Sequence, residues 1–350
     1  MNPNIHRALA SAALAACTAA MAAPHDNLDV QLSLPNPVVH GDVNIAVDVA
    51  ITNTSGHAVT LSRWQLPSEH LQGPLFRITR EDGTAVDYTG PLVKRVKGGE
   101  KDTVHLAAGE ALSYRVELTG AYEIGNGRFA IEYVGHGQRE ADASVESTAP
   151  LYLWTDGRTV APAAADVDKL ESLRKGMAGS ISYTGACTSS EKTQLQSAVN
   201  AATSYATESN SYLSASPHST QRYVKWFGTY SSSRWNTAHT HFTNEENAFK
   251  TKPLTLDCSC NDRNTYAYVY PNQPYKIYLC GAFWSAPMTG TDSKGGTLIH
   301  EMSHFTVVAG TDDWAYGQTA AANLARTNPT RALDNADNHE YFAENNPYLP

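Results

Sequence analysis

The sequence predicts two domains of different class: an all-β antiparallel sandwich, followed by an α+β domain that is mainly helical with a small β-sheet. Up to about residue 145, apolar and polar residues alternate in short runs separated by turn-forming residues. In the second half, helical periodicity and capping patterns are found instead, together with four of the five cysteines. At 350 residues and 41 % hydrophobic content, the chain is long enough for two such domains.

The first 23 residues have the composition of an export signal. Arg7 precedes an alanine-rich run that is too short to span a bilayer, and residues 20–22 offer a cleavage site of the A-x-A type. We therefore expect a secreted protein without a transmembrane segment. Residues 14–17 also resemble a bacterial lipoprotein cleavage site. Anchoring through a lipid on Cys17 is therefore the alternative.

The net charge of the chain is −9, and no basic cluster offsets it. This balance argues against a nucleic-acid partner and favours a cationic substrate or partner. We expect the protein to be a monomer.

Residues 24–148 are predicted to form the sandwich, with about seven strands and no cysteine. The period of two is clearest in residues 30–34, 43–51, 114–118 and 129–133. Residues 149–179 are predicted to be a linker with a short helix in residues 166–175. Its basic pair, Arg174 and Lys175, suits a proteolytic activation cut.

Residues 180–350 form the predicted second domain. Thr188 and Glu191 make a capping-box pattern at the start of a long amphipathic helix. Tyrosines alternate in residues 266–270 as in a strand, and residues 275–280 read as a second strand after a proline-containing turn. The domain therefore combines helices with a small sheet.

The stretch HEMSH, residues 300–304, carries the strongest functional signal. On a helix, His300 and His304 lie one turn apart on the same face, so both imidazoles can reach one zinc ion. Glu301 would then lie beside the open position of the metal. Gly310 is a natural helix stop, after which the chain can fold back on the metal. The pattern indicates a hydrolytic zinc site.

A catalytic zinc ion needs a third protein ligand. The metzincin pattern is excluded, because Val307 and Gly310 stand where it needs glycine and histidine. The next glutamate along the chain is Glu340, for which zinc ligation is the less favoured use. The nearest acids are Asp312 and Asp313. Chemistry alone does not choose between these two, since paired acids after a glycine commonly lie in turns.

Here the chain resembles the aspzincin metallopeptidases, the family of deuterolysin and peptidyl-Lys metalloendopeptidase, whose signature is HExxH followed by GTxDxxYG. Residues 310–317 read GTDDWAYG and match every fixed position. The resemblance covers residues 180–350 and implies a zincin-like zinc endopeptidase of proteins or peptides. It implies one Zn²⁺ with Asp313 as third ligand, Glu301 as general base towards the attacking water, and Tyr316 as hydrogen-bond donor to the oxyanion.

The even number of cysteines in the exported second domain implies two disulfides, with three possible pairings. Because Cys258 and Cys260 are only two residues apart, we expect each to take a separate partner. The resemblance implies the pairs Cys187 with Cys258 and Cys260 with Cys280.

Asp337 and Glu340 are spaced to share one face of a helix or turn. The resemblance implies that they line the S1′ pocket, as in lysine-specific members of the family, so that cleavage occurs before lysine. The sandwich is then expected to be a propeptide that inhibits its own peptidase domain. It has no cysteine for a cysteine switch, and a lysine from the basic turn Lys94, Arg95, Lys97 and Lys101 could fill the acidic pocket instead.

Two other functions remain open. One is a peptidase of broad specificity, like the deuterolysin branch, which the acidic pair argues against. The other is an exported surface-binding protein with a vestigial zinc domain. The presence of Glu301 and Tyr316 argues against this second reading, because a purely structural zinc ion does not need a general base.

Overall fold

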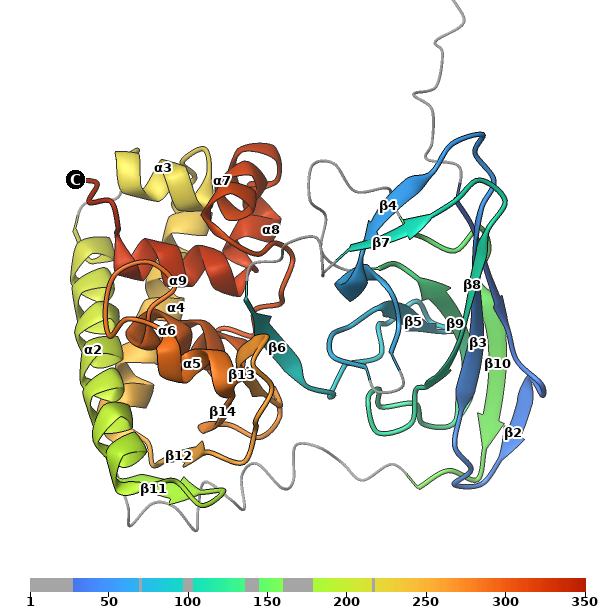
Figure 1. Ribbon diagram of the computed structural model, residues 1–350, viewed down its shortest axis with the longest axis horizontal. Helices are drawn as coiled ribbons and strands as arrows, with labels where there is room; N and C mark the ends of the chain where they lie inside the picture. The colour runs from blue at the N-terminus through green and yellow to red at the C-terminus, as the bar shows by residue number, and fades with distance from the viewer. Residues whose placement is uncertain (1–27, 69–70, 97–102, 136–144, 160–178, 216–217) are drawn as a thin grey trace, which may run out of the picture.

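The computed structural model describes residues 28–68, 71–96, 103–135, 145–159, 179–215 and 218–350. It has a β region in the first half of the chain and a region of helices with a small sheet in the second half (Figure 1). The predicted signal sequence, Cys17, the short helix of the linker and the basic pair Arg174 and Lys175 all lie outside the described residues.

Three sheets form the β region, and their apolar faces enclose one core. One sheet has the order β1-β3-β8, with β1 (Leu28–Ser33), β3 (Ala46–Asn53) and β8 (Ala111–Glu117). The second has the order β2-β10-β9-β5, with β2 (Val38–His40), β10 (Leu151–Asp156), β9 (Gly127–Tyr133) and β5 (Phe76–Arg80). β4 (Val59–Ser62) pairs with β7 (Thr103–Leu106), and a short 3-10 helix, η1 (Arg63–Gln65), follows β4.

The β region differs from the predicted sandwich in three details. In its described part nine strands form the three sheets, where the sequence predicts about seven. β2 and β10 pair in parallel rather than antiparallel fashion. β10 lies within residues 149–179, so the prediction of a linker there is wrong for Leu151–Asp156. The sequence does not predict this strand, because its aromatic residues Tyr152 and Trp154 are exposed while Leu153 is buried.

The second region is built on a five-stranded sheet with the order β11-β12-β14-β13-β6. Four strands come from the second half of the chain: β11 (Ile181–Thr184), β12 (Leu254–Asp257), β13 (Thr265–Val269) and β14 (Lys276–Leu279). The last two are the predicted tyrosine strand and its partner. The fifth strand, β6 (Leu92–Arg95), comes from the first half and pairs antiparallel with β13 (Figure 1). β6 thereby covers backbone groups that an edge strand would otherwise expose.

Eight helices surround this sheet in the described residues. α2 (Ser189–Leu213) begins at the predicted capping box, because Thr188 Oγ1 accepts from Glu191 N. The others are α3 (Gln221–Phe227), α4 (Ser232–Thr251), α5 (Gly281–Ser285), α6 (Lys294–His304), α7 (Gln318–Thr327), α8 (Pro329–Leu333) and α9 (Ala336–Glu344). None of the helices in the described part of the chain is long and apolar enough to cross a bilayer.

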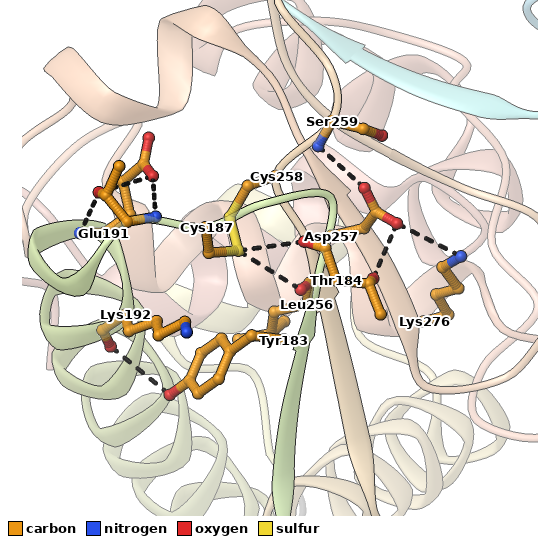
Figure 2. The surroundings of a disulfide bond; sticks show 11 residues. Tyr183, Thr184, Cys187, Glu191, Lys192, Leu256, Asp257, Cys258, Ser259 and Lys276 are labelled. Carbon is orange, nitrogen blue, oxygen red and sulfur yellow. Dashed lines mark hydrogen bonds and ion pairs between the residues drawn. A yellow bond between two sulfur atoms is a disulfide. The ribbon is translucent and has the colours of Figure 1, made fainter.

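Both disulfides have the expected pairing, Cys187 with Cys258 and Cys260 with Cys280. The first joins the segment after β11 to the end of β12, where Asp257 accepts a hydrogen bond from Thr184 and pairs with Lys276 (Figure 2). The second joins the segment before β13 to the residue that precedes α5. Each bridge is expected to stabilise the second region by about 2–4 kcal/mol.

A buried contact fixes α9 against the start of α6. The Glu344 carboxylate, at the end of α9, accepts hydrogen bonds from Ser293 N and Ser293 Oγ, next to the first turn of α6. Gly296 leaves room for this contact, since a Cβ there would lie 2.1 Å from Glu344 Oε1. The two helices that carry the candidate site residues therefore approach each other at a glycine.

We expect Gly296→Ala to destabilise the second region by about 1–3 kcal/mol, because the added methyl group displaces the Glu344 carboxylate from its partners. Thermal unfolding followed by circular dichroism measures this. Gly56→Ala is the matched control, since a Cβ at Gly56 meets no atom within 4 Å. Equal melting temperatures for the two variants would show that the contact is not tight.

Candidate metal centre

α6 holds the three residues of the HExxH pattern in the interior. His300, Glu301 and His304 are each 0 % exposed. The rings of His300 and His304 lie on the same side of the helix, with centroids 4.8 Å apart. α6 ends at His304, and the chain turns at Gly310, whose φ of +64° lies in the left-handed region that favours glycine. This turn brings the following residues back towards the two histidines.

Of the two adjacent aspartates, Asp313 faces the histidines. Its Oδ1 lies 3.1 Å from His300 Nε2 and 3.5 Å from His304 Nε2. Asp312 instead forms a backbone bridge with Asn335, and burial raises the pKa of its carboxyl to about 8. The structure thus brings together His300, His304 and Asp313, the set that the family resemblance implies, and places Asp312 in the turn.

The other ring nitrogen of each histidine faces an oxygen. His304 Nδ1 lies 2.7 Å from the carbonyl oxygen of Thr311, and His300 Nδ1 lies 2.9 Å from Asp337 Oδ1. Such contacts fix the orientation of a metal-binding imidazole and leave Nε2 free for the metal. The role of Asp337 beside His300 is not predicted from the sequence, because no spacing rule connects α9 to α6.

The atoms that converge here fit a zinc ion. His300 Nε2, His304 Nε2 and both carboxylate oxygens of Asp313 are buried and have no hydrogen-bond partner among the described residues. Buried polar groups normally have partners, so four such atoms together call for a ligand. The three side chains each offer one donor atom, and these atoms lie within 4.8 Å of one another. Two imidazoles and a carboxylate are a donor set typical of catalytic zinc.

Glu301 lies next to this donor set without a partner of its own. Neither of its carboxylate oxygens has a hydrogen-bond partner among the described residues. Burial raises the pKa of Glu301 to about 8. A cation held by His300, His304 and Asp313 would lower this pKa again, towards the range in which a carboxylate can take a proton near neutral pH.

Tyr316 lies three residues beyond Asp313, and its hydroxyl contacts the first half of the chain. The Tyr316 hydroxyl donates a hydrogen bond of 3.2 Å to the carbonyl oxygen of Val93, in β6. Its ring packs against Trp64, with the centroids 5.9 Å apart. The hydroxyl is therefore directed at a peptide carbonyl group of β6.

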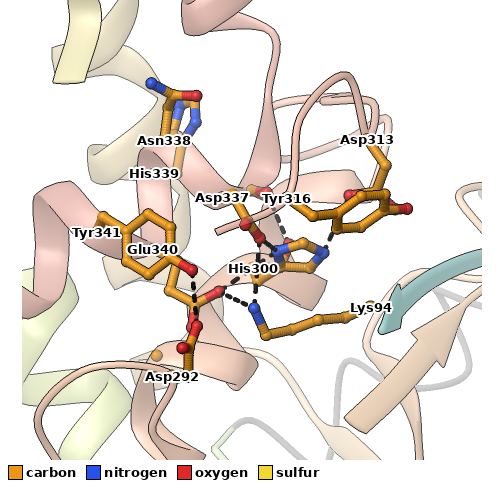
Figure 3. A network of polar contacts seen from close by, with 12 residues as sticks. Lys94, Asp292, His300, Asp313, Tyr316, Asp337, Asn338, His339, Glu340 and Tyr341 are labelled. Carbon is orange, nitrogen blue, oxygen red and sulfur yellow. Dashed lines mark hydrogen bonds and ion pairs between the residues drawn. The ribbon is translucent and has the colours of Figure 1, made fainter. Parts of the chain in front are cut away.

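Asp337 and Glu340 lie on one face of α9 and form an acidic pocket that holds the ammonium group of Lys94 (Figure 3). Lys94 Nζ lies 3.3 Å from Asp337 Oδ1 and contacts Glu340 Oε2 directly. All three side chains are at most 2 % exposed. The pocket adjoins the metal set, since His300 Nδ1 lies 3.4 Å from Glu340 Oε2.

Charge pairing governs the protonation of this pocket. Burial favours the neutral form of Asp337, but the Lys94 ammonium and His300 outweigh it and hold the pKa of this carboxyl below its ordinary value. Burial raises the pKa of Glu340, and Lys94 opposes this effect. Although burial disfavours a charged lysine, Asp337 and Glu340 hold the pKa of Lys94 well above its ordinary value.

Two further residues of the pocket are not predicted from the sequence. The ring of Tyr266 lies beneath Lys94, with its centroid 5.5 Å from Nζ. Asp292 adds a third carboxylate nearby and accepts a hydrogen bond of 2.6 Å from the Tyr341 hydroxyl. Tyr266 is an extra residue where the pairing of β13 with β6 shifts register. A sequence pattern of alternating tyrosines does not reveal such a β-bulge.

The chain is similar to several known proteins. The aspzincin family model, described as lysine-specific metallo-endopeptidase, matches residues 212–344. An "Extracellular protease" of Aeromonas hydrophila is 43 % identical over 333 residues, which is 91 % of this chain and 92 % of that protein. A "Peptidyl-Lys metalloendopeptidase" of Grifola frondosa is 38 % identical over 330 residues, which is 91 % of this chain and 93 % of that protein.

A solved structure, titled as a zinc peptidase from Grifola frondosa, is 53 % identical to the chain, with a TM-score of 0.45. The match between the two covers 47 % of this chain and 100 % of the solved chain. The two relatives described above match nearly the whole length of this chain at well over 30 % identity. From these relatives and the family model, this chain belongs to the aspzincin family of zinc metalloendopeptidases.

Proposed function

We propose that the protein is a secreted zinc endopeptidase that cleaves before lysine and is made as a latent proenzyme. The observation that carries this proposal is the Lys94 ammonium between Asp337 and Glu340, in a pocket that adjoins the His300, His304 and Asp313 set. A lysine of the chain itself thus occupies the place proposed for a substrate lysine. The name of the Aeromonas relative, an extracellular protease, supports secretion.

In the proposed mechanism, His300, His304 and Asp313 would hold a zinc ion, which would lower the pKa of the attacking water towards about 7. Glu301, buried and without a partner among the described residues, takes a proton from the attacking water and passes it to the leaving amine. Tyr316 donates a hydrogen bond to the carbonyl oxygen on which negative charge develops. Asp337 keeps the His300 ring oriented through its contact with Nδ1.

Lysine preference follows from the charge and size of the pocket. Asp337 and Glu340 are buried, so their negative charges need a cation close by. A compact ammonium group satisfies both carboxylates at the observed distances, and the Tyr266 ring adds a cation–π contact. A broad-specificity peptidase has no use for two buried carboxylates at this position. The pocket therefore favours the lysine-specific reading over that alternative.

Latency follows from the position of β6. β6 lies along β13, and its Lys94 side chain fills the acidic pocket, so a substrate strand cannot bind in the same place. In this proposal the β region, including β10 (Leu151–Asp156), acts together with β6 as an intramolecular inhibitor. The activation cut falls in residues 149–179, after β10, and the signal sequence is removed from residues 1–23. A surface-binding protein with a vestigial zinc domain would not need its own lysine in this pocket.

Lys94→Ala should relieve latency, because the pocket loses its occupant while the rest of β6 remains. We expect the full-length, zinc-loaded variant to cleave an Xaa-Lys reporter peptide at least about tenfold faster than the wild type before maturation, since a charge-assisted contact contributes about 1.5–3 kcal/mol. Arg95→Gln is the matched control, because the Arg95 guanidinium contacts Gln72 rather than the pocket. Equal activation by both variants would contradict the role of Lys94.

Glu340→Gln, made in the Lys94→Ala background, should lower kcat/KM for Xaa-Lys peptides on the order of 10- to 100-fold, because one carboxylate partner of the ammonium is lost. Cleavage of Xaa-Arg peptides should change less. Steady-state kinetics on matched peptide pairs measures both. An unchanged ratio of lysine to arginine cleavage would remove the claim of lysine preference.

Glu301→Gln, in the same background, should lower kcat by on the order of 10²–10⁴ while one zinc ion per chain remains bound. Asp313→Asn should instead lower the zinc content, measured by elemental analysis. Asp312→Asn is its matched control and should keep zinc, because the Asp312 carboxyl, with a pKa of about 8, is already largely neutral in the folded protein. Zinc loss in Asp312→Asn with retention in Asp313→Asn would reverse the proposed ligand assignment.

A further inference from the structure

The backbone of β6 is held on both sides of the Val93–Lys94 peptide bond. In the antiparallel pairing with β13, Val93 lies opposite Tyr268 and Lys94 lies opposite Ala267. Leu92 and Arg95 continue the pairing in the two directions. β6 therefore lies on β13 as an extended peptide bound by strand addition, and not only as a side chain inserted into a pocket.

The carbonyl group of this bond also meets a residue of the proposed machinery. The oxygen that accepts from the Tyr316 hydroxyl belongs to Val93, the residue directly before the pocket lysine. Lys94 directly follows Val93, and its side chain contacts Asp337 and Glu340. The proposed oxyanion donor and the proposed lysine pocket thus engage the two residues that share one peptide bond.

An occupant that only blocked the pocket would not need this backbone alignment. Pocket binding requires the lysine side chain alone, and it fixes neither the carbonyl direction nor the strand direction. Here the lysine lies in the acidic pocket and the carbonyl oxygen of the residue before it accepts from the Tyr316 hydroxyl, as cleavage before lysine in the proposed mechanism requires. Val93 is only 5 % exposed, so the bond lies inside the site and not at its rim.

We infer that the Val93–Lys94 bond is the first substrate of this chain, cut by its own active site. The inference rests on the proposed function and adds the identity of an internal substrate. One water is consumed and the bond between Val93 C and Lys94 N breaks. The hydroxyl of the water ends on the Val93 carbonyl carbon, and its proton is carried by Glu301 to the Lys94 nitrogen.

The cut ends would stay in place, so that the nick alone does not activate the enzyme. On one side, Leu92 and Val93 remain buried. On the other, Val96 N donates to Asn264 O at 2.9 Å, and the Lys94 ammonium stays between its carboxylates. Neither disulfide joins the two pieces, since both lie after residue 186. The nick therefore separates the pieces only under denaturing conditions.

The test uses the full chain, purified with a chelator and then given zinc, with samples taken over time for denaturing mass spectrometry. We expect a fragment that begins at Lys94 and one that ends at Val93, formed at a rate that does not depend on protein concentration. Arg95→Gln should still be cut, and Lys94→Ala should not be cut at this bond. Under native size-exclusion chromatography the two pieces should elute together.

Two comparisons make the result decisive. Glu301→Gln chains mixed with wild-type chains should remain whole at this bond, which shows that the cut is intramolecular. A fragment that begins at Arg95, in place of the one that begins at Lys94, would show a cut after lysine and would contradict the inference. An intact bond in the wild type, together with peptide cleavage by Lys94→Ala, would overturn the inference and leave the proposed function standing. If neither reaction occurs, both are wrong.

Discussion

The position of the His300 imidazole between two carboxylates is the constraint on which the rest of the site depends. Asp313 lies on its Nε2 side and Asp337 on its Nδ1 side, at 3.1 and 2.9 Å. The first carboxylate comes from the turn after α6 and the second from α9. This one ring therefore ties together the metal set and the acidic pocket, and α6 and α9 must keep their relative position for either to form. The close approach of the two helices at Gly296 maintains that position.

Uncompensated negative charge explains why the two parts of the site take cations. Asp313, Asp337 and Glu340 are all buried close together, and the negative charge of these carboxylates must be offset. Lys94 offsets it in the acidic pocket, and a zinc ion would offset it between the histidines. The same physical need thus supports both the metal and the preference for a lysine side chain. It also explains why the first half of the chain is held against the second by a buried ammonium group.

Much of this arrangement could be predicted from the sequence, because it depends on local patterns. The capping box at Thr188, the tyrosine strand and the positions of His300 and His304 on one helix face follow from spacing alone. The choice of Asp313 over Asp312 required the family signature, since both residues lie in the same turn. The transfer of β6 to the second sheet, the contact of Asp337 with His300 and the bulge at Tyr266 depend on long-range packing, for which no sequence period exists. β10 is not predicted from the sequence, because its exposed face carries the aromatic residues.

The most direct test of the central claim is anomalous diffraction at the zinc edge from crystals of the full-length protein. We expect one peak per chain, about 2.0–2.2 Å from His300 Nε2, His304 Nε2 and an Asp313 oxygen. Lys94 should occupy the neighbouring acidic pocket in the same crystals. A peak beside His300 Nδ1, Asp337 and Glu340, with Lys94 displaced, would contradict the account.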